Sequence, residues 1–329
     1  PVGPSPYVVS FESHLPRYWW RYEDWANQAC IRSLESSACR AIVAMSHAAA
    51  RTFAKQHATS PHLAKLLDKL VVIYPNIPIP DQPDLLAGDA CEELRLVFVG
   101  AHFGRKGGCV AVRVAELARQ NGLPIHVTII SKLEHGAGIW TDPQRPGFFD
   151  RYLKLLDADN VTFLDGAPNA VVLDTFARSH VALLPTFADT FGYSAIEAMA
   201  RWTPTIATRQ GALPEFIDDE CGFMLDLETD DVGEWVGVGQ DGGTEAFERY
   251  FADEVERLSQ ETIARLTPLI GNPAGMAKLR AAARARAISM FDAAKASRIL
   301  DELYDRAVER PISAEIQPKT PILAARFQR

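Results

Sequence analysis

Two acids stand eight positions apart in this chain, Asp189 in a predicted loop and Glu197 in a predicted helix. An apolar run ends at Pro185 just before them, and Phe191-Gly192 lies between them. Carboxylates accept hydrogen bonds from hydroxyls, so two acids on either side of an anion-binding turn suit a sugar-phosphate ligand. A capping box is the alternative explanation of Glu197, because Ser194 would cap the helix and Glu197 would reach back three residues.

A second segment, FVGAHFGRKGG (98–108), places Arg105 and Lys106 between a strand-like run and a helix-like run. Amides at a helix N-terminus attract phosphate, and adjacent cations strengthen that attraction. The spacing fits neither a Walker A loop nor G-x-G-x-x-G, and a turn with two solvated cations is the alternative. A third segment, GALPE (211–215), opens a short helix and could be a simple connection.

Short apolar, β-branched runs alternate with helix-like stretches, which predicts a doubly wound, parallel α/β sheet. Ligands bind such sheets beyond the carboxyl ends of the strands, so the loops after Gly100, Ser131, Leu164 and Pro185 are the places to examine. The predicted strands are YVVSF (7–11), AIVAM (41–45), LRLVFVG (94–100), IHVTIIS (125–131), NVTFL (160–164), VALLP (181–185) and PTIAT (204–208).

The proline-rich stretch 74–88 predicts a linker, with a domain boundary near Pro80. We therefore expect one domain over 1–80 and a second over 81–285, followed by a closing helix over 286–310 and a loose tail over 311–329. The acidic, glycine-rich segment 226–243 is interpreted as a surface insertion.

Composition limits the possible functions. The 329 residues carry a net charge of -8, which argues against a protein held to nucleic acid by phosphate contacts and against strong adsorption to anionic lipid. The five cysteines are scattered without a C-x-x-C pair, as expected for reduced thiols in the cytoplasm. The N-terminus lacks a signal-peptide pattern and a Met, so we expect that an N-terminal piece is missing.

The motifs, taken in order, resemble those of the retaining glycosyltransferases of family four, which have the GT-B fold. They read GAHFGRKGG, DTFGYSAIE, EAMARWTP and GALPE, and the resemblance spans roughly Tyr7 to Tyr304. It implies two Rossmann-like domains, the first incomplete. It also implies transfer of a sugar from a nucleoside-diphosphate sugar to an acceptor hydroxyl, with retention of the anomeric configuration.

The resemblance also implies roles for individual residues. Lys106, helped by Arg105, would contact the diphosphate, and Asp189 would contact the donor sugar. Glu197 would hold the ribose hydroxyls. The remaining donor-binding positions are the base-contacting Gly166 and Ala167 and the turn formed by Phe191, Gly192, Tyr193 and Ser194.

Glu12 aligns with the histidine that ends a strand of the family's first domain and faces the reaction centre. We therefore count Glu12, Lys106 and Asp189 as candidate catalytic residues, and His14 and Arg17 as weaker ones. An exposed carboxylate at a strand end is the alternative for Glu12. The chain departs from the family where Ala101 replaces an arginine and Trp202 replaces a glycine.

No H-x-x-H, C-x-x-C or D-x-D cluster lies near the proposed site, so we expect neither a metal nor another cofactor. The expected partners are a nucleotide-sugar donor and a saccharide or lipid-linked acceptor, with no nucleic acid and at most peripheral membrane contact. The expected place is the cytoplasm or the inner face of a membrane. The alternatives are a non-catalytic nucleotide-sugar-binding domain and a GT-B epimerase.

Overall fold

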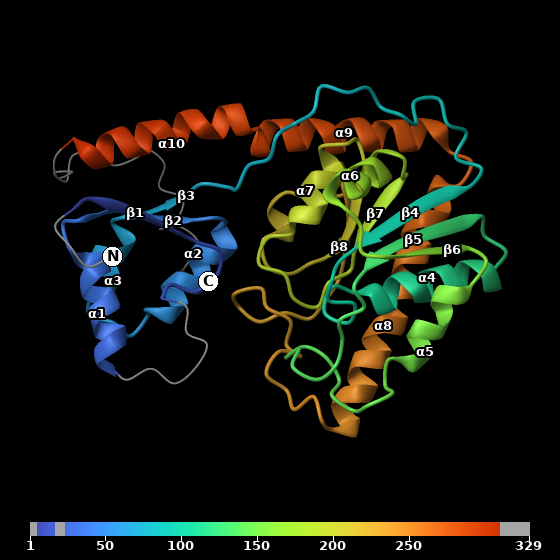
Figure 1. Ribbon diagram of the computed structural model, residues 1–329, viewed down its shortest axis with the longest axis horizontal. Helices are drawn as coiled ribbons and strands as arrows, with labels where there is room; N and C mark the ends of the chain where they lie inside the picture. The colour runs from blue at the N-terminus through green and yellow to red at the C-terminus, as the bar shows by residue number, and fades with distance from the viewer. Residues whose placement is uncertain (1–4, 17–23, 310–329) are drawn as a thin grey trace.

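The computed structural model describes residues 5–16 and 24–309, which form two parallel sheets (Figure 1). The N-terminal sheet has the strand order β1-β2-β3, and Val9 pairs with Ile42, which pairs with Leu70. Three helices pack on it around Phe53, which is fully buried. The elements are β1 (Tyr7–Phe11), α1 (Asp24–Glu35), β2 (Cys39–Ala44), α2 (His47–Gln56), α3 (Leu63–Leu67) and β3 (Leu70–Val72).

The C-terminal sheet has six parallel strands in the order β6-β5-β4-β7-β8-β9. The chain builds outward from β4 in one direction and then restarts at β7 on the other side, so the order reverses between β4 and β7. Such a reversal opens a crevice at the carboxyl ends of the two strands. The strands are β4 (Leu94–Val99), β5 (Ile125–Ser131), β6 (Val161–Asp165), β7 (Val181–Leu184), β8 (Thr205–Thr208) and β9 (Gly222–Leu225).

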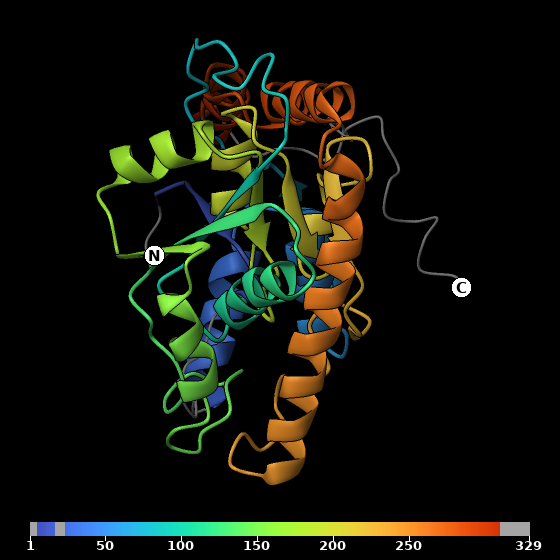
Figure 2. The same cartoon turned by 90° about the vertical axis from the view of Figure 1, so that its right-hand side faces the viewer.

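Helices cover both faces of this sheet because its buried strands expose apolar side chains alternately to either side. Leu96 and Phe98 pack with α4 and α8, whereas Val97 packs with α6 and α7. Figure 2 shows α4 beside the long α8. These helices and turns are α4 (Gly108–Gln120), α5 (Asp150–Leu153), η1 (Lys154–Asp157), α6 (Asn169–Ala177), α7 (Tyr193–Met199), η2 (Leu213–Glu215), α8 (Glu245–Leu266) and η3 (Thr267–Leu269).

Two connections join the sheets. Residues 73–93, where the prolines predict a linker, contain no helix and only an isolated bridge between Ile77 and Asp292. The chain returns through α9 (Pro273–Phe291) and α10 (Ala293–Val308), which run along one side of both sheets (Figure 1). The helices break at Asp292, whose carboxylate accepts a hydrogen bond from the Lys295 amide at 2.9 Å and caps α10.

The predicted doubly wound α/β class is confirmed, and all seven predicted strands are present. Two further strands, β3 and β9, were not predicted. Within residues 5–16 and 24–309, no helix is both long enough and apolar enough to cross a bilayer.

Candidate active site

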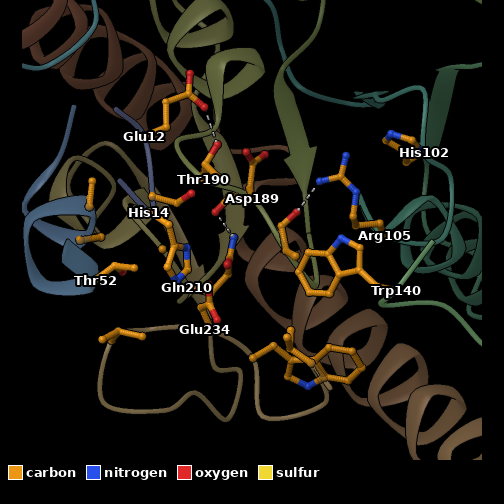
Figure 3. Close-up of a pocket in the computed structure, with 18 of the residues that line it drawn as sticks. Glu12, His14, Thr52, His102, Arg105, Trp140, Asp189, Thr190, Gln210 and Glu234 are labelled. Carbon is orange, nitrogen blue, oxygen red and sulfur yellow. Dashed lines mark hydrogen bonds between the residues drawn. The ribbon is translucent and has the colours of Figure 1, made fainter. Parts of the chain in front are cut away.

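A cavity of about 620 Å³ lies between the N-terminal sheet and the carboxyl ends of the C-terminal strands (Figure 3). One wall comes from the residues after β1 and from α2. The opposite wall comes from the loops after β4, β7 and β8, and a third side comes from residues 138–140 and 232–238. The charged and aromatic side chains on these walls include those of Glu12, Arg105, Trp140, Asp189 and Glu234, and the Thr190 hydroxyl lies beside them.

The loop after β4 carries Arg105 into the cavity wall, whereas Lys106 does not line the cavity and contacts the lining residue Asp189. The loop enters α4 through Gly107, whose φ is +85° and where a Cβ would lie 2.1 Å from the carbonyl oxygen of Pro185. Only glycine fits this close approach, so the loop rests directly on the end of β7. The Arg105 Nη1 donates a hydrogen bond to the Ala188 carbonyl at 3.2 Å, and Arg105 lines the cavity.

The loop after β7 brings Asp189 to Lys106, its Oδ2 lying 2.5 Å from the Lys106 Nζ. Only 9% of the Asp189 side chain and 20% of the Lys106 side chain are exposed. The two residues come from different motifs and meet where the strand order reverses. The next residue, Thr190, donates its hydroxyl hydrogen to Glu12 Oε2 at 2.9 Å.

Glu12 therefore lies in the cavity wall with a defined partner, rather than at an isolated strand end. His14 lies in the same wall, and Figure 3 shows it on the side away from Arg105. Arg17, the other weak candidate, lies outside the described residues. The structure thus brings together Glu12, Arg105, Lys106 and Asp189 among the predicted site residues.

The turn before α7 is built differently from the capping box considered above. The N-cap of α7 is Gly192, with a φ of +94°, and no side chain caps the helix. Ser194 is already the second helical residue, so Glu197 lies too far along the helix to reach back to a cap. The capping-box alternative is therefore wrong. The Phe191 side chain is buried and stacks on Phe216, so Phe191 could meet a ligand only through its backbone.

Glu197 is half-buried on α7, and burial raises the pKa of its carboxyl group. Among the described residues, none donates a hydrogen bond to this carboxylate, although Arg201 lies close enough to favour its charge. Neither Glu197 nor the pair Gly166 and Ala167 lines the cavity. Gly166 lies at the end of β6 against the Lys132 side chain.

The third motif supplies a contact between the sheets. Glu215 in η2 accepts hydrogen bonds from the backbone amides of His47 at 2.9 Å and Ala48 at 2.6 Å, and from the Tyr74 hydroxyl at 2.8 Å. The two amides begin α2, where a negative charge is favourable. Glu215 thus fixes α2, and with it the Ala48 and Ala49 part of the cavity wall, to the C-terminal sheet.

Sequence reasoning missed several cavity residues. Trp140 follows β5 in a glycine-containing loop, and its position after a strand end was the one available signal. The interpretation of 226–243 as a surface insertion is wrong for its central part. Trp235 is 1% exposed, stacks on Tyr250, and contacts Phe187, so the segment packs into the core and places Glu234 at the cavity.

The two departures from the family pattern have different outcomes. Trp202 adopts a φ of +65°, a left-handed conformation that glycine would adopt without strain. Its indole nitrogen donates to the Gln82 carbonyl at 3.0 Å, and the Arg284 guanidinium lies over its ring. These contacts offset the backbone strain. Ala101 is exposed, and nothing in the structure explains the loss of the arginine there.

One trio among the described residues, Asp89, Cys91 and His180, has the spacing of metal ligands. It lies at the amino ends of β4 and β7, on the edge of the sheet opposite to the cavity. The His180 Nδ1 accepts a hydrogen bond from the Arg95 amide at 2.9 Å, so the proton must reside on Nε2. Nε2 is therefore not free to bind a cation, and the Arg95 guanidinium already pairs with Asp89.

The comparisons with known proteins agree with this arrangement. Residues 93–236 match the family model described as "Glycosyl transferases group 1". A D-inositol 3-phosphate glycosyltransferase from Mycolicibacterium vanbaalenii is 28% identical over 149 residues, covering 44% of this chain and 32% of that protein. Another, from Corynebacterium diphtheriae, is 36% identical over 70 residues, covering 21% of this chain and 16% of that protein. The chain thus spans about a third or less of the length of these relatives.

Solved structures resemble the chain over almost its whole length. A glycosyltransferase from Rickettsia africae has a TM-score of 0.60 at 15% identity, covering 92% of this chain and 71% of that one. HepE from Anabaena, solved with UDP-glucose, has a TM-score of 0.59 at 15% identity, with 92% and 72% covered. The predicted GT-B fold and the resemblance to family four are confirmed.

Proposed function

We propose that this chain, a GT-B protein similar to the family-four glycosyltransferases, transfers a sugar from a nucleoside-diphosphate sugar to an acceptor hydroxyl with retention. One observation supports the proposal above the others. Lys106 and Asp189 come from different motifs and meet at the reversal of strand order, beside a cavity that Glu12 of the N-terminal sheet also lines. In this proposal residues 1–80 form the acceptor side and 81–285 the donor side.

The leaving group in such a transfer is a nucleoside diphosphate, which gains negative charge as the bond to the sugar breaks. In this proposal Lys106 and Arg105 stabilise that charge, together with the positive end of the α4 dipole that follows them. These groups need no metal ion, so we propose donor binding without one. HepE was solved with UDP and with UDP-glucose, which makes these the first compounds to test.

Asp189 has two roles in this proposal. In the structure its carboxylate pairs with Lys106. When the diphosphate binds Lys106, the Asp189 oxygens are released to accept hydrogen bonds from the sugar hydroxyls. Leaving group and acceptor then share one face of the sugar, and Glu12, which accepts a hydrogen bond from Thr190 next to Asp189, would lie near the acceptor hydroxyl. In this proposal the acceptor is a saccharide or a lipid-linked saccharide. The proposed localisation of the protein is the cytoplasm.

Calorimetry on four variants tests the donor site. Lys106→Ala removes a charge-assisted contact of about 1.5–3 kcal/mol and should weaken UDP binding about 10- to 150-fold. Glu197→Gln should weaken the binding of UDP, because the charged acceptor for the ribose hydroxyls is lost. Asp189→Asn should weaken the binding of UDP-glucose. UDP itself should bind as tightly or more tightly, because the carboxylate that pairs with Lys106 is gone. Lys278→Ala, an exposed charge on α9, is the control.

Unchanged UDP affinity in both Lys106→Ala and Glu197→Gln would end the glycosyltransferase assignment of this site. Glu12→Gln extends the test to the acceptor side. It should lower transfer while leaving UDP affinity unchanged, and equal transfer rates would leave Glu12 without a role in the reaction. Turnover with and without an added acceptor separates transfer from epimerisation and from binding alone.

A further inference from the structure

Positive charge is scarce in the cavity that the proposed donor would enter. Arg105 is the only lysine or arginine among the described residues that line it. Lys106, which lies beside the cavity, already pairs with Asp189. The diphosphate of a nucleotide-sugar carries a negative charge on each phosphate, so a further cation close to Arg105 would strengthen its binding.

Two histidines, His14 and His102, are the other basic residues that line the cavity. His14 lies on the side away from Arg105, whereas His102 lies on the same side as Arg105 (Figure 3). His102 also belongs to the same loop, and its carbonyl accepts a hydrogen bond from the Lys106 amide at 3.0 Å. The imidazole of His102 is therefore the basic group that can act together with Arg105 and Lys106.

The backbone of His102 is held by the segment that follows β5. The Ala101 carbonyl accepts a hydrogen bond from the Glu134 amide at 3.1 Å, and the Phe103 amide donates to the Glu134 carbonyl at 2.6 Å. These bonds form an isolated parallel bridge between His102 and Glu134. Because the backbone under the ring is fixed, little ordering entropy is lost when a ligand contacts His102.

The groups around the imidazole of His102 keep it uncharged until an anion arrives. Burial lowers the pKa of His102, Arg105 and Lys106 lower it further, and the Glu134 carboxylate opposes them. The buried Nδ1 lies 3.0 Å from Glu134 Oε2, but the two atoms are not aligned for a hydrogen bond. At neutral pH the ring is thus largely neutral, and a phosphate beside its exposed side would favour the charged form.

We propose, resting on the proposed function, that His102 is a further donor-binding residue, which takes up a proton from solvent when the diphosphate binds. One N–H of the imidazolium then donates to a phosphate oxygen, and the other faces Glu134. Because the complex holds one more proton than the free protein, the affinity for the donor should rise as the pH falls. Each pH unit between the pKa of free His102 and its higher pKa in the complex changes that affinity at most about tenfold.

Calorimetry with UDP-glucose between pH 6 and pH 8 tests this proposal. UDP is less suitable, because its terminal phosphate itself titrates with a pKa of about 6. UDP-glucose should bind about five- to tenfold more tightly at pH 6 than at pH 8. Titrations in buffers of different ionisation enthalpy should show a net uptake of protons.

Two substitutions of His102 separate a charge effect from a structural one. His102→Gln should bind UDP-glucose at pH 6 about as weakly as the parent does at pH 8. His102→Arg carries a charge that does not titrate in this range, so it should bind tightly at both pH values. A residue with only a structural role would not be rescued by arginine in this way.

His135→Gln is the matched control, because His135 lies next to Glu134 but packs on Phe149 and does not line the cavity. This variant should keep the pH dependence. The proposal is overturned if the parent takes up no proton or if His102→Gln keeps the pH dependence. It is also overturned if His102→Arg binds no more tightly than His102→Gln at pH 8.

Inorganic pyrophosphate separates this proposal from the proposed function. The NMR signal of the His102 ring, assigned with His102→Gln, should titrate at higher pH when pyrophosphate is bound. If UDP-glucose does not bind but pyrophosphate moves this titration, the proposed function fails and the diphosphate contact of His102 stands. If pyrophosphate leaves the titration of His102 unchanged, the contact is refuted whether or not UDP-glucose binds.

Discussion

Glu215 connects the two sheets through three hydrogen bonds, and replacing it by glutamine should lower the free energy of unfolding. The carboxylate accepts hydrogen bonds from the amides of His47 and Ala48 and from the hydroxyl of Tyr74. The Ser46 side chain caps the next amide of α2, so the first turn of the helix depends on these two groups together. Burial and the nearby Glu215 raise the pKa of Tyr74, which therefore remains a donor.

The size of the loss follows from the contacts. Hydrogen bonds to a charged group contribute about 1.5–3 kcal/mol, and neutral ones about 0.5–1.5 kcal/mol. In Glu215→Gln the side-chain oxygen can keep at most part of the set, while the NH₂ group faces a backbone donor. The charge at the α2 N-terminus is also lost, which costs a further 0.3–1 kcal/mol or so. We expect the free energy of unfolding to fall by about 2–4 kcal/mol.

Urea unfolding followed by fluorescence measures this loss, with Tyr74→Phe as the matched control. Tyr74→Phe removes one of the three donors to the charged carboxylate and should cost about 1.5 kcal/mol, the lower end of the range for such bonds because the oxygen keeps another donor. The double variant should lose less than the sum of the single variants, because both changes remove the same hydrogen bond. A Glu215→Gln loss below about 0.5 kcal/mol, or strict additivity, would refute the proposed link.

Three further predictions concern other residues. Burial raises the pKa of Asp142 from 3.8 to about 6, so between these pH values the folded state binds a proton that the unfolded state has lost. The contribution of Asp142 to the free energy of unfolding should therefore fall by about 3 kcal/mol from pH 4 to 7. Thermal melts across this range measure the fall, and Asp142→Asn should make stability depend less on pH. The free energy of unfolding measured with urea should be about 1 kcal/mol lower for Trp202→Ala than for Trp202→Gly, because only glycine adopts the left-handed conformation without strain. Equal stabilities would refute this. UDP affinity should survive chelator treatment, and a large loss would contradict metal-free binding.

Local pattern was sufficient for the elements that build the sheet. The apolar runs over 94–100 and 181–185 are buried on both faces, so their composition alone indicates parallel strands. Glycine commonly follows the end of a helix, and Gly122 adopts a φ of +64° just beyond Asn121, the cap residue of α4. Because parallel strands share one carboxyl edge, the predicted topology also brought Lys106 and Asp189 to the same edge.

The missed features depend on tertiary contacts. The strand β3 has only three residues, and β9 begins with Gly222 after an acidic stretch, so neither carries a periodic signal. The segment 226–243 is acidic and glycine-rich, but Trp235 is buried against Tyr250 on α8, a contact between residues that no local pattern joins. Likewise, the capping box matched the sequence spacing, and only the position of Gly192 as the N-cap excludes it.

Three of the candidate site residues already have partners within the protein, and this bears on the strength of donor binding. Lys106 pairs with Asp189, Arg105 donates to Ala188, and Glu12 accepts from Thr190. A donor must therefore exchange existing contacts for new ones, so each new hydrogen bond contributes only the difference. We accordingly expect the Lys106→Ala effect on UDP in the lower part of the 10- to 150-fold range. Asp189→Asn abolishes the ion pair that UDP must displace, so a UDP affinity lower than that of the parent would contradict this exchange.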